Sequence, residues 1–506
     1  MGFSEILTLS NRPVVRVLSL VILFTAFTHF QPLTVSIVDH DIWWHLRGGD
    51  TILAQHTFPH HGVFTQHTER PWIEYSWGFE IIISRLYHWF GLMGILALRL
   101  CFVVLISAIL FAILYRELGH FWWAWLLTAL GMWLIQHCLG TRPMLFSIAI
   151  FAVEIGVLFE ALRKARIGLL WLLPPLFVLW ANLHIQFLYG IIVLGLLTLT
   201  TLFHAVFPAR WTSWFETPRL RFAEVVGVLG LSILGTLIGP YSWHLYGVIH
   251  DYAQSSVPYS LIMELQALNF REPSHFVLVL LVSAAFLALG WRHSRDPFKF
   301  LLMVACTVIG LRMSRDSWVA CIPALAIIAD REVPWAMPTV RTWRGPLAFV
   351  GATAAATVAT LAVVVWDTRT DNALLDKVVE LNFPTKACEF IRSHSLPGPL
   401  YNAANWGGFL TWALPEKPVA IDNRTDLYGD ELTERSYIVQ HAEIDWRSDP
   451  DLKVAQVILL SRDLQLATAL YQDKHFRLVY YDNLAVVFTR NDASLSASAS
   501  YRPATP

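Results

Sequence analysis

The chain has 506 residues, of which 55% are hydrophobic and 15% charged, with a formal net charge of −1 and a mean hydropathy of +0.50. Soluble domains carry about a quarter charged residues, so this composition excludes an ordinary soluble enzyme and favours a polytopic membrane protein. The near-zero net charge gives no reason to expect a nucleic-acid partner. The cysteines show no CxxC spacing, so neither a disulfide framework nor a cysteine metal site is predicted.

Apolar segments recur along the first 366 residues, many of them near the roughly 17–25 residues needed to cross a bilayer. We predict about eleven membrane helices. They lie at 13–31, 92–115, 121–138, 144–162, 168–183, 187–207, 222–239, 275–291, 298–312, 317–330 and 346–366. The predicted layout is an all-α polytopic membrane domain over residues 1–366.

The distribution of Lys and Arg predicts the orientation of these helices, because short basic loops stay on the cytoplasmic side. With the N-terminus inside, every second loop is basic, including RKAR at 163–166. This regularity requires that the segment 72–90 does not cross. It carries Glu74, Glu80 and Arg85 among apolar residues, which is typical of a helix lying in the membrane interface. The long first loop at 32–91 and the segment after residue 366 are therefore predicted to be extracytoplasmic.

The C-terminal segment 367–490 is predicted to be a small α/β domain. PTKACEFIRSH indicates a helix that starts at Pro384, and KPVAID, VAQVILL, FRLVYYD and LAVVFTR have the apolar runs of strands in a covered sheet. The low-complexity end, 491–506, is predicted to be a disordered tail.

The stretch VDHDIWWHLRGGD, at 38–50, places two acids directly after the first apolar segment. An enzyme facing the outer surface has no nucleotide sugar at hand, so the simplest activated donor is a sugar carried on a lipid phosphate. Its site needs a carboxylate that accepts the proton of the acceptor, and cations or a metal that stabilise the leaving phosphate. Asp39 and Asp41 meet the first need. The alternative role of either acid is to cap the following helix, but one helix does not need two caps.

These features together resemble a known family. The first helix, the external loop opening on DHD and WWHLRGGD, the interfacial helix after RPWIEYSW, the many spans and the external C-terminal domain resemble the GT-C superfamily of integral-membrane glycosyltransferases. RPMLFS, WANLH, GPYSWHLY and AIDNRTDLYG look like a bacterial branch of that superfamily, related to its protein mannosyltransferase-like and aminoarabinose transferase-like members. The resemblance implies a polyprenyl-phosphate-linked sugar as the donor. It also implies a multi-pass location in the bacterial inner membrane, with a cytoplasmic N-terminus and a periplasmic C-terminal domain.

The resemblance also assigns roles to the acidic motif. It makes Asp39 and Asp41 the source of the general base and, where a divalent cation such as Mg²⁺ or Mn²⁺ takes part, its ligands. The motif is DHD, whereas mannosyltransferase-like members often carry an adjacent acidic pair. Which aspartate is the base, and whether a metal is needed, therefore stay open.

Polar residues on the predicted outer side are candidates for substrate binding. Arg142 and Arg315 break the orientation rule, and a guanidinium holds phosphate oxygens in pairs; extension of both side chains to lipid headgroups is the alternative. Asp316 is placed to fix the geometry of Arg315. Asn182 and His184 lie where a helix pair emerges, with a helix–helix hydrogen bond as the rival role.

Two further candidates are His45 and Glu264. His45 follows Asp41 by four residues and so shares its helical face. Glu264 either lines an acceptor path or belongs to an ordinary amphipathic helix. In the tail, Gly407 and Gly408 are typical of a turn. Asp422, Arg424 and Asp426 are typical of an internal cluster of ion pairs that docks this domain on the membrane part, with direct catalysis as the alternative.

We therefore expect a membrane glycosyltransferase that moves a sugar from a polyprenyl-phosphate donor to a lipid, glycan or protein on the outer face. The alternative is a non-catalytic transporter or flippase of lipid-linked glycans, which usually has inverted repeats and helices broken at mid-membrane. The sequence shows no such repeat. A membrane-anchored sensor would need only one or two of the predicted spans.

Overall fold

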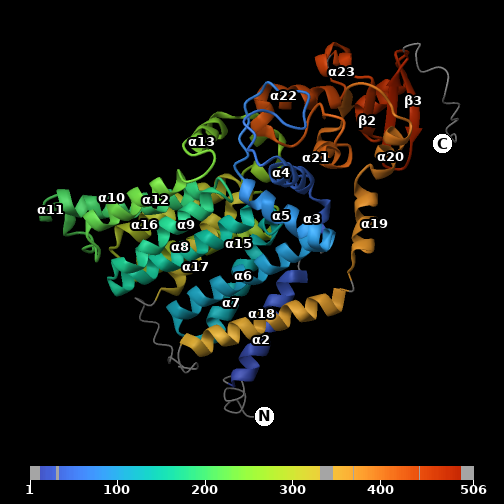
Figure 1. Ribbon diagram of the computed structural model, residues 1–506. Helices are drawn as coiled ribbons and strands as arrows, with labels where there is room; N and C mark the ends of the chain where they lie inside the picture. The colour runs from blue at the N-terminus through green and yellow to red at the C-terminus, as the bar shows by residue number, and fades with distance from the viewer. Residues whose placement is uncertain (1–11, 30–33, 331–345, 369, 444, 492–506) are drawn as a thin grey trace. The chain divides into compact units, whose positions relative to one another are not determined.

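The computed structural model describes residues 12–29, 34–330, 346–368, 370–443 and 445–491, which are mostly helical with a small sheet near the C-terminus (Figure 1). The contacts divide the chain into two compact units. Unit 1 comprises Met1–Leu33, Ala97–Ser242 and Ile262–Thr370, and unit 2 comprises Thr34–Leu96, Trp243–Leu261 and Asp371–Pro506. The predicted disordered tail lies, from residue 492 onward, outside the described residues.

Unit 1 consists of helices, and each apolar segment predicted from the sequence forms one. The long elements are α2 (Pro13–His29), α6 (Leu92–Leu118), α7 (Phe121–Ile135), α8 (Met144–Lys164), α9 (Leu173–Ala181), α10 (Phe187–Val206), α12 (Phe222–Thr236), α15 (Pro273–Trp291), α16 (Pro297–Arg312), α17 (Ser317–Ala329) and α18 (Pro346–Thr368). Short elements connect them: η1 (Gln136–Cys138), η2 (Ile167–Leu172), α11 (Ala209–Thr212), η3 (Met263–Leu265) and η4 (Ser314–Asp316). Of the described helices, α6, α8, α10 and α15 have the length and apolar composition to cross a membrane.

Local sequence explains where several of these helices begin. Proline occupies the first turn of α15 and α16, where its missing N–H costs no helix hydrogen bond. Asp296 caps α16, because its Oδ1 accepts the backbone N–H of Phe298 at 2.9 Å. α17 is apolar on every side and nearly all of its residues are buried. It packs against α7, α8, α15 and α16, and so forms the core of unit 1.

Unit 2 combines the first loop of the chain with the C-terminal segment. Its helices are α3 (Val35–Val38), α4 (Ile42–Gln55), α5 (Trp77–Phe90), α13 (His244–Gln254), α14 (Val257–Leu261), α19 (Asn372–Asn382), α20 (Thr385–Ser393), α21 (Ala404–Ala413), α22 (Thr425–Gln440), η5 (Trp446–Ser448), α23 (Pro450–Val454) and α24 (Gln465–Tyr471). α20 begins directly after Pro384, as the sequence predicts. α5 begins at Trp77 rather than at Trp72, so Glu74 lies in the loop before the helix.

α4 and α5 pack closely because two glycines lie at their contact. A Cβ atom on Gly49 would meet the backbone oxygen of Glu80 at 2.2 Å, and one on Gly48 would meet Glu80 Oε2 at 2.4 Å. Only residues without a side chain allow this approach. Glu80 is completely buried as a result.

The sheet of unit 2 has the strand order β1-β2-β4-β3. β1 (Leu400–Asn402) pairs with β2 (Val457–Ser461) in parallel, and β4 (Ala485–Arg490) pairs antiparallel with both β2 and β3 (Phe476–Tyr481). Three of the predicted strands are confirmed. The fourth, KPVAID at 417–422, is wrong: Val419 forms only an isolated bridge with Thr65, and Pro418 has no N–H for a ladder.

The predicted turn at Gly407 and Gly408 is also wrong, because both glycines lie inside α21. A Cβ on Gly407 would meet the backbone oxygen of Ile421 at 2.1 Å, and one on Gly408 would meet that of His40 at 2.6 Å. The glycine pair therefore serves close packing of α21 against two backbone segments.

Candidate functional site

The acidic motif lies between α3 and α4, and both aspartates are half-buried. The Oδ1 atom of Asp39 accepts the backbone N–H of Asp41 at 3.0 Å. Asp41 is the residue before α4, yet its side chain makes no capping hydrogen bond with the first turn. Asp39 therefore stabilises the turn, and helix capping does not account for Asp41.

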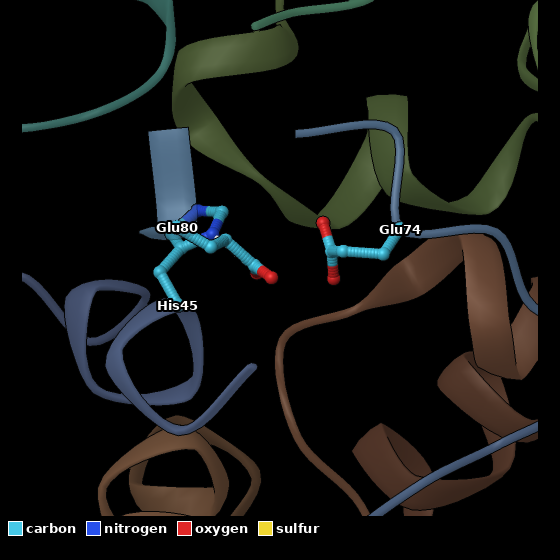
Figure 2. Close-up of side chains that lie close together, drawn as sticks. All are labelled: His45, Glu74 and Glu80. Carbon is cyan, nitrogen blue, oxygen red and sulfur yellow. Dashed lines mark hydrogen bonds and ion pairs between the residues drawn. The ribbon is translucent and has the colours of Figure 1, made fainter. Parts of the chain in front are cut away.

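One turn into α4, His45 meets two buried glutamates. His45 Nδ1 lies 3.0 Å from Glu80 Oε1, and one ligand atom each of His45, Glu74 and Glu80 lie within 4.8 Å of one another. Figure 2 shows the two carboxylates directed toward each other. The three residues, called the His45 cluster below, are only 4%, 1% and 0% exposed. Among the described residues they are the one such group of three that could hold a metal ion.

Burial makes two neighbouring negative charges costly in the His45 cluster. Burial raises the pKa of Glu74 to about 8, although the hydrogen bond with Glu80 and the charge of Arg424 act in the opposite direction. Burial and then the charge of Glu74 raise the pKa of Glu80 well above its ordinary value. One further oxygen of each glutamate, Oε2, has no hydrogen-bond partner among the described residues. A shared proton or a cation between the carboxylates removes this conflict.

The raised pKa of Glu74 predicts how stability depends on pH in metal-free protein. The folded state holds this proton more tightly than the unfolded chain does. The contribution of Glu74 to the free energy of unfolding is therefore fully present below pH 4.5 and is lost as the pH rises through about 8. Glu74→Gln should reduce this decline, as measured by thermal unfolding in detergent with a chelator present. Glu434→Gln, at an exposed position of the same unit, should keep it. An unchanged decline in Glu74→Gln would contradict the prediction.

A buried ion pair lies beside this cluster. Arg424 Nη2 contacts Asp422 Oδ2 at 2.6 Å, Arg424 Nε donates to Asp422 Oδ1 at 2.9 Å, and both side chains are almost fully buried. Arg424 Nη2 also donates to the carbonyl of Val63 at 2.9 Å. The guanidinium lies 4.6 Å from the ring of Trp72. The predicted ion pair between Asp422 and Arg424 is therefore confirmed, and it joins the C-terminal segment to the first loop; docking of this segment on the membrane part stays a prediction.

Unit 1 holds a separate polar group formed by Arg142, Glu264 and Arg315. Glu264 Oε1 accepts from Arg142 Nη1 at 2.5 Å and from Arg315 Nη1 at 3.5 Å. All three side chains are partly exposed. Burial alone would raise the pKa of Glu264, but the two guanidinium groups bring it below its ordinary value. Two cations against one anion leave this group with a net positive charge.

Asp316 is buried next to Arg315 and binds to the start of α10. Its Oδ1 accepts from Gln186 Nε2 at 2.8 Å, and its Oδ2 accepts from the hydroxyl of Tyr189. Burial raises the pKa of Asp316, while Arg315 acts in the opposite direction. His137 Nε2 lies 2.9 Å from the carbonyl of Ser314 on the other side. These contacts hold the segment that carries Arg315 in place.

His184 and Asn182 lie in the link between α9 and α10. His184 Nδ1 lies 2.8 Å from Ser147 Oγ, and the same hydroxyl accepts from Trp180 Nε1 at 2.8 Å. Burial, followed by the charge of Arg315, lowers the pKa of His184 to about 3, so the imidazole is neutral at physiological pH. The Asn182 amide donates to the carbonyls of Val178 and Ile238, both at 2.7 Å. The hydrogen bond to Ile238, which follows α12, supports the helix–helix role of Asn182.

The predicted site residues thus form two sets. Asp39, Asp41 and His45 belong to unit 2, while the other candidates belong to unit 1: Arg142, Asn182, His184, Glu264, Arg315 and Asp316. Whether the two sets serve one site stays a prediction. The sequence alone does not mark Glu74 and Glu80 as functional candidates, because acids among apolar residues are also typical of an interfacial helix. The available signal was the presence of two acids in the aromatic run WIEYSWGFE.

The fold defined by these elements is shared with solved structures of another membrane protein. Among solved structures, ArnT from Cupriavidus metallidurans bound to undecaprenyl phosphate shares it, with 16% sequence identity and a TM-score of 0.51 over 94% of this chain and 98% of that chain. ArnT from the same organism in the apo state matches 92% of this chain and 97% of its own, with 16% identity and a TM-score of 0.48. No protein-family model matches the sequence, and no curated protein does.

Proposed function

We propose that this chain is a membrane glycosyltransferase that moves a sugar from a polyprenyl-phosphate-linked donor to an acceptor on the extracytoplasmic face. The main support is the fold that the chain shares with ArnT over 94% of its length, together with a half-buried acidic motif where α4 begins. The ArnT structure of this fold holds undecaprenyl phosphate, a lipid of the class expected here. The acceptor is a lipid, a glycan or a protein.

We further propose that the eleven predicted helices of unit 1 cross the inner membrane of a bacterium, with the N-terminus in the cytoplasm. The charge pattern supports this orientation, since alternate loops carry the basic residues. The acidic motif, the Arg142–Glu264–Arg315 group and the C-terminal α/β segment then share the periplasmic side.

We assign each set of residues a role in the transfer reaction by its chemistry. Asp39 or Asp41 accepts the proton of the acceptor as its oxygen or nitrogen attacks the anomeric carbon. Arg142 and Arg315 bind the phosphate that leaves, because paired guanidinium groups match phosphate oxygens. In the absence of the donor, Glu264 binds both arginines. The net positive charge of this group favours phosphate as a replacement for Glu264 at the two guanidinium groups. Neutral His184 and buried Asp316 keep the surrounding loops in place.

The test is sugar transfer in nanodiscs that contain the purified protein and a polyprenyl-phosphate donor with a labelled sugar. The proposed enzyme releases polyprenyl phosphate and moves the label to an acceptor. A flippase, in contrast, would move the intact labelled lipid across the bilayer of a proteoliposome without cleaving the sugar–phosphate bond. If a panel of labelled donors crosses the bilayer and none is cleaved, the protein is a transporter and the proposed transferase activity is wrong.

We also propose that a divalent cation binds to the His45 cluster rather than to the two aspartates alone. The fit rests on one imidazole and two carboxylates with buried oxygens that lack partners. Such mixed nitrogen and oxygen donors suit Mn²⁺ or Zn²⁺ better than Mg²⁺. When bound, the ion would neutralise the two glutamates and hold their carboxylates and the His45 imidazole near the start of α4.

Metal binding predicts a cation-dependent melting temperature. After treatment with a chelator, added Mn²⁺ or Zn²⁺ should stabilise the wild type by about 2.7 kcal/mol when the ion is at roughly 100 times its Kd. Glu74→Gln should lose most of this stabilisation, and Glu434→Gln should keep it. Equal melting temperatures of the wild type with the chelator and with each cation would exclude the metal.

A further inference from the structure

Unit 2 contains a cavity of about 420 Å³ that the assigned roles do not use. Its walls come from the loop 71–73, from Trp243 with α13, and from the start of α22. This volume lies within the range of about 300–1,000 Å³ that small-molecule sites occupy. Ile73 in its wall directly precedes Glu74 of the His45 cluster in the chain.

The walls of the cavity are held in place by polar contacts. Asp430 Oδ2, on α22, accepts the backbone N–H of Ser256 at 2.8 Å and that of Val257 at 3.3 Å, which ties α22 to the link after α13. Trp72, another lining residue, is held by the guanidinium of Arg424, which lies 4.6 Å from the centroid of its ring. A cavity whose walls are fixed in advance costs little ordering when a ligand binds.

The lining combines aromatic rings with carboxylates and lacks strong cations. Trp243 is 65% exposed and stacks on His244, with 3.9 Å between the ring centroids. Asp251, Asp426 and Asp430 bring carboxylates to the lining, and none of the fifteen lining residues is Lys or Arg. Arg424 is neutralised by Asp422, and the guanidinium of Arg70, which lies beside Gly429 of the lining, donates to the carbonyl of Tyr428 at 2.6 Å. The three carboxylates of the lining outnumber this one neighbouring cation, and the excess of negative charge disfavours a phosphate or other anion here.

We propose that this cavity binds a sugar ring, either neutral or bearing an amino group. The apolar face of a pyranose or furanose packs on the indole of Trp243, and its hydroxyl or ammonium groups donate hydrogen bonds to Asp251 and Asp426. Asp430 accepts backbone N–H groups of Ser256 and Val257 and forms part of the cavity wall. The biological role of the cavity rests on the proposed transferase function, in which it holds the glycosyl group of the donor or a carbohydrate acceptor next to the acidic cluster.

Binding is measured by ligand-observed NMR titration of the full-length protein in nanodiscs without donor lipid. The probes are methyl glycosides of neutral sugars, methyl glycosides of amino sugars, and sugar 1-phosphates. A neutral or amino glycoside should bind, and the sugar phosphates should bind more weakly. Trp243→Ala and Asp251→Asn should each raise the Kd about fivefold, the equivalent of one modest contact. Both positions are exposed, so the fold should tolerate these changes.

Matched controls are Trp214→Ala, at a residue that is 75% exposed in unit 1, and Asp463→Asn, at an exposed acid of unit 2; both should keep the wild-type Kd. The inference is overturned if no glycoside binds, if sugar phosphates bind as tightly as neutral glycosides, or if both cavity variants keep the wild-type Kd. In the transfer assay, a raised KM of Trp243→Ala for the donor or for the acceptor shows which sugar the cavity holds.

The sugar-binding proposal and the proposed transferase function can be disproved independently. Glycoside binding that depends on Trp243, without any transfer from lipid-linked donors, would leave the cavity as a sugar site and remove the transferase. Transfer that proceeds normally in the cavity variants, without glycoside binding, would remove the sugar site and leave the transferase.

Discussion

Asp41→Asn and Asp39→Asn, made separately, should show that one of them carries most of the catalysis. Loss of the general base should lower kcat by about 10²–10⁴-fold, which corresponds to roughly 3–5 kcal/mol of transition-state stabilisation. The amide has nearly the shape of the carboxylate but neither its charge nor its ability to accept the proton.

The geometry of the turn allows the effect of the charge to be separated from an effect on the structure. In Asp39→Asn, the Oδ1 of the amide can still accept the backbone N–H of Asp41, so the turn is preserved. A lower rate in this variant is then caused by the loss of the carboxylate charge. The measurement is the initial rate of release of polyprenyl phosphate at saturating donor. Asp463→Asn, at an exposed position of the same unit, is the control and should retain the wild-type rate. Full activity in both motif variants would remove this mechanism.

The largest effect on stability is expected from Asp422→Asn. The change leaves the guanidinium of Arg424, which is 1% exposed, without its anionic partner. Removing one partner of a buried pair costs about 3–5 kcal/mol, because the remaining charge stays buried without compensation. The hydroxyl of Tyr428, which donates to Asp422 Oδ2 at 3.1 Å, would also lose charge-assisted bonding.

Thermal unfolding in detergent measures this loss, and limited proteolysis of the C-terminal segment reports where it occurs. Replacing both partners by apolar residues, Asp422→Leu with Arg424→Met, should recover part of the stability, since no unpaired charge remains. Asp463→Asn again serves as the exposed control. A melting temperature of Asp422→Asn equal to that of the wild type would show that the pair does not stabilise unit 2.

Part of the candidate site was visible in the sequence and part was not. Asp39, Asp41 and His45 are neighbours along the chain, so their shared location follows from local spacing alone. Arg142, Glu264 and Arg315 were identified one by one as polar residues on the predicted outer side. Their hydrogen bonds join positions more than a hundred residues apart along the chain in the case of Arg142 and Glu264, and no local pattern reports such a pairing.

The sequence by itself determined the helices of unit 1 and three of the four strands, because long apolar runs must satisfy their own backbone hydrogen bonds as helices and short apolar runs suit a covered sheet. The tertiary structure alone decided that Glu74 and Glu80 are buried against His45, and that Gly407 and Gly408 serve helix packing. It also decided that Arg424 reaches the carbonyl of Val63 across 361 positions of sequence. Periodicity records which side of an element is apolar, whereas the partner of a buried charge depends on which distant segment packs there.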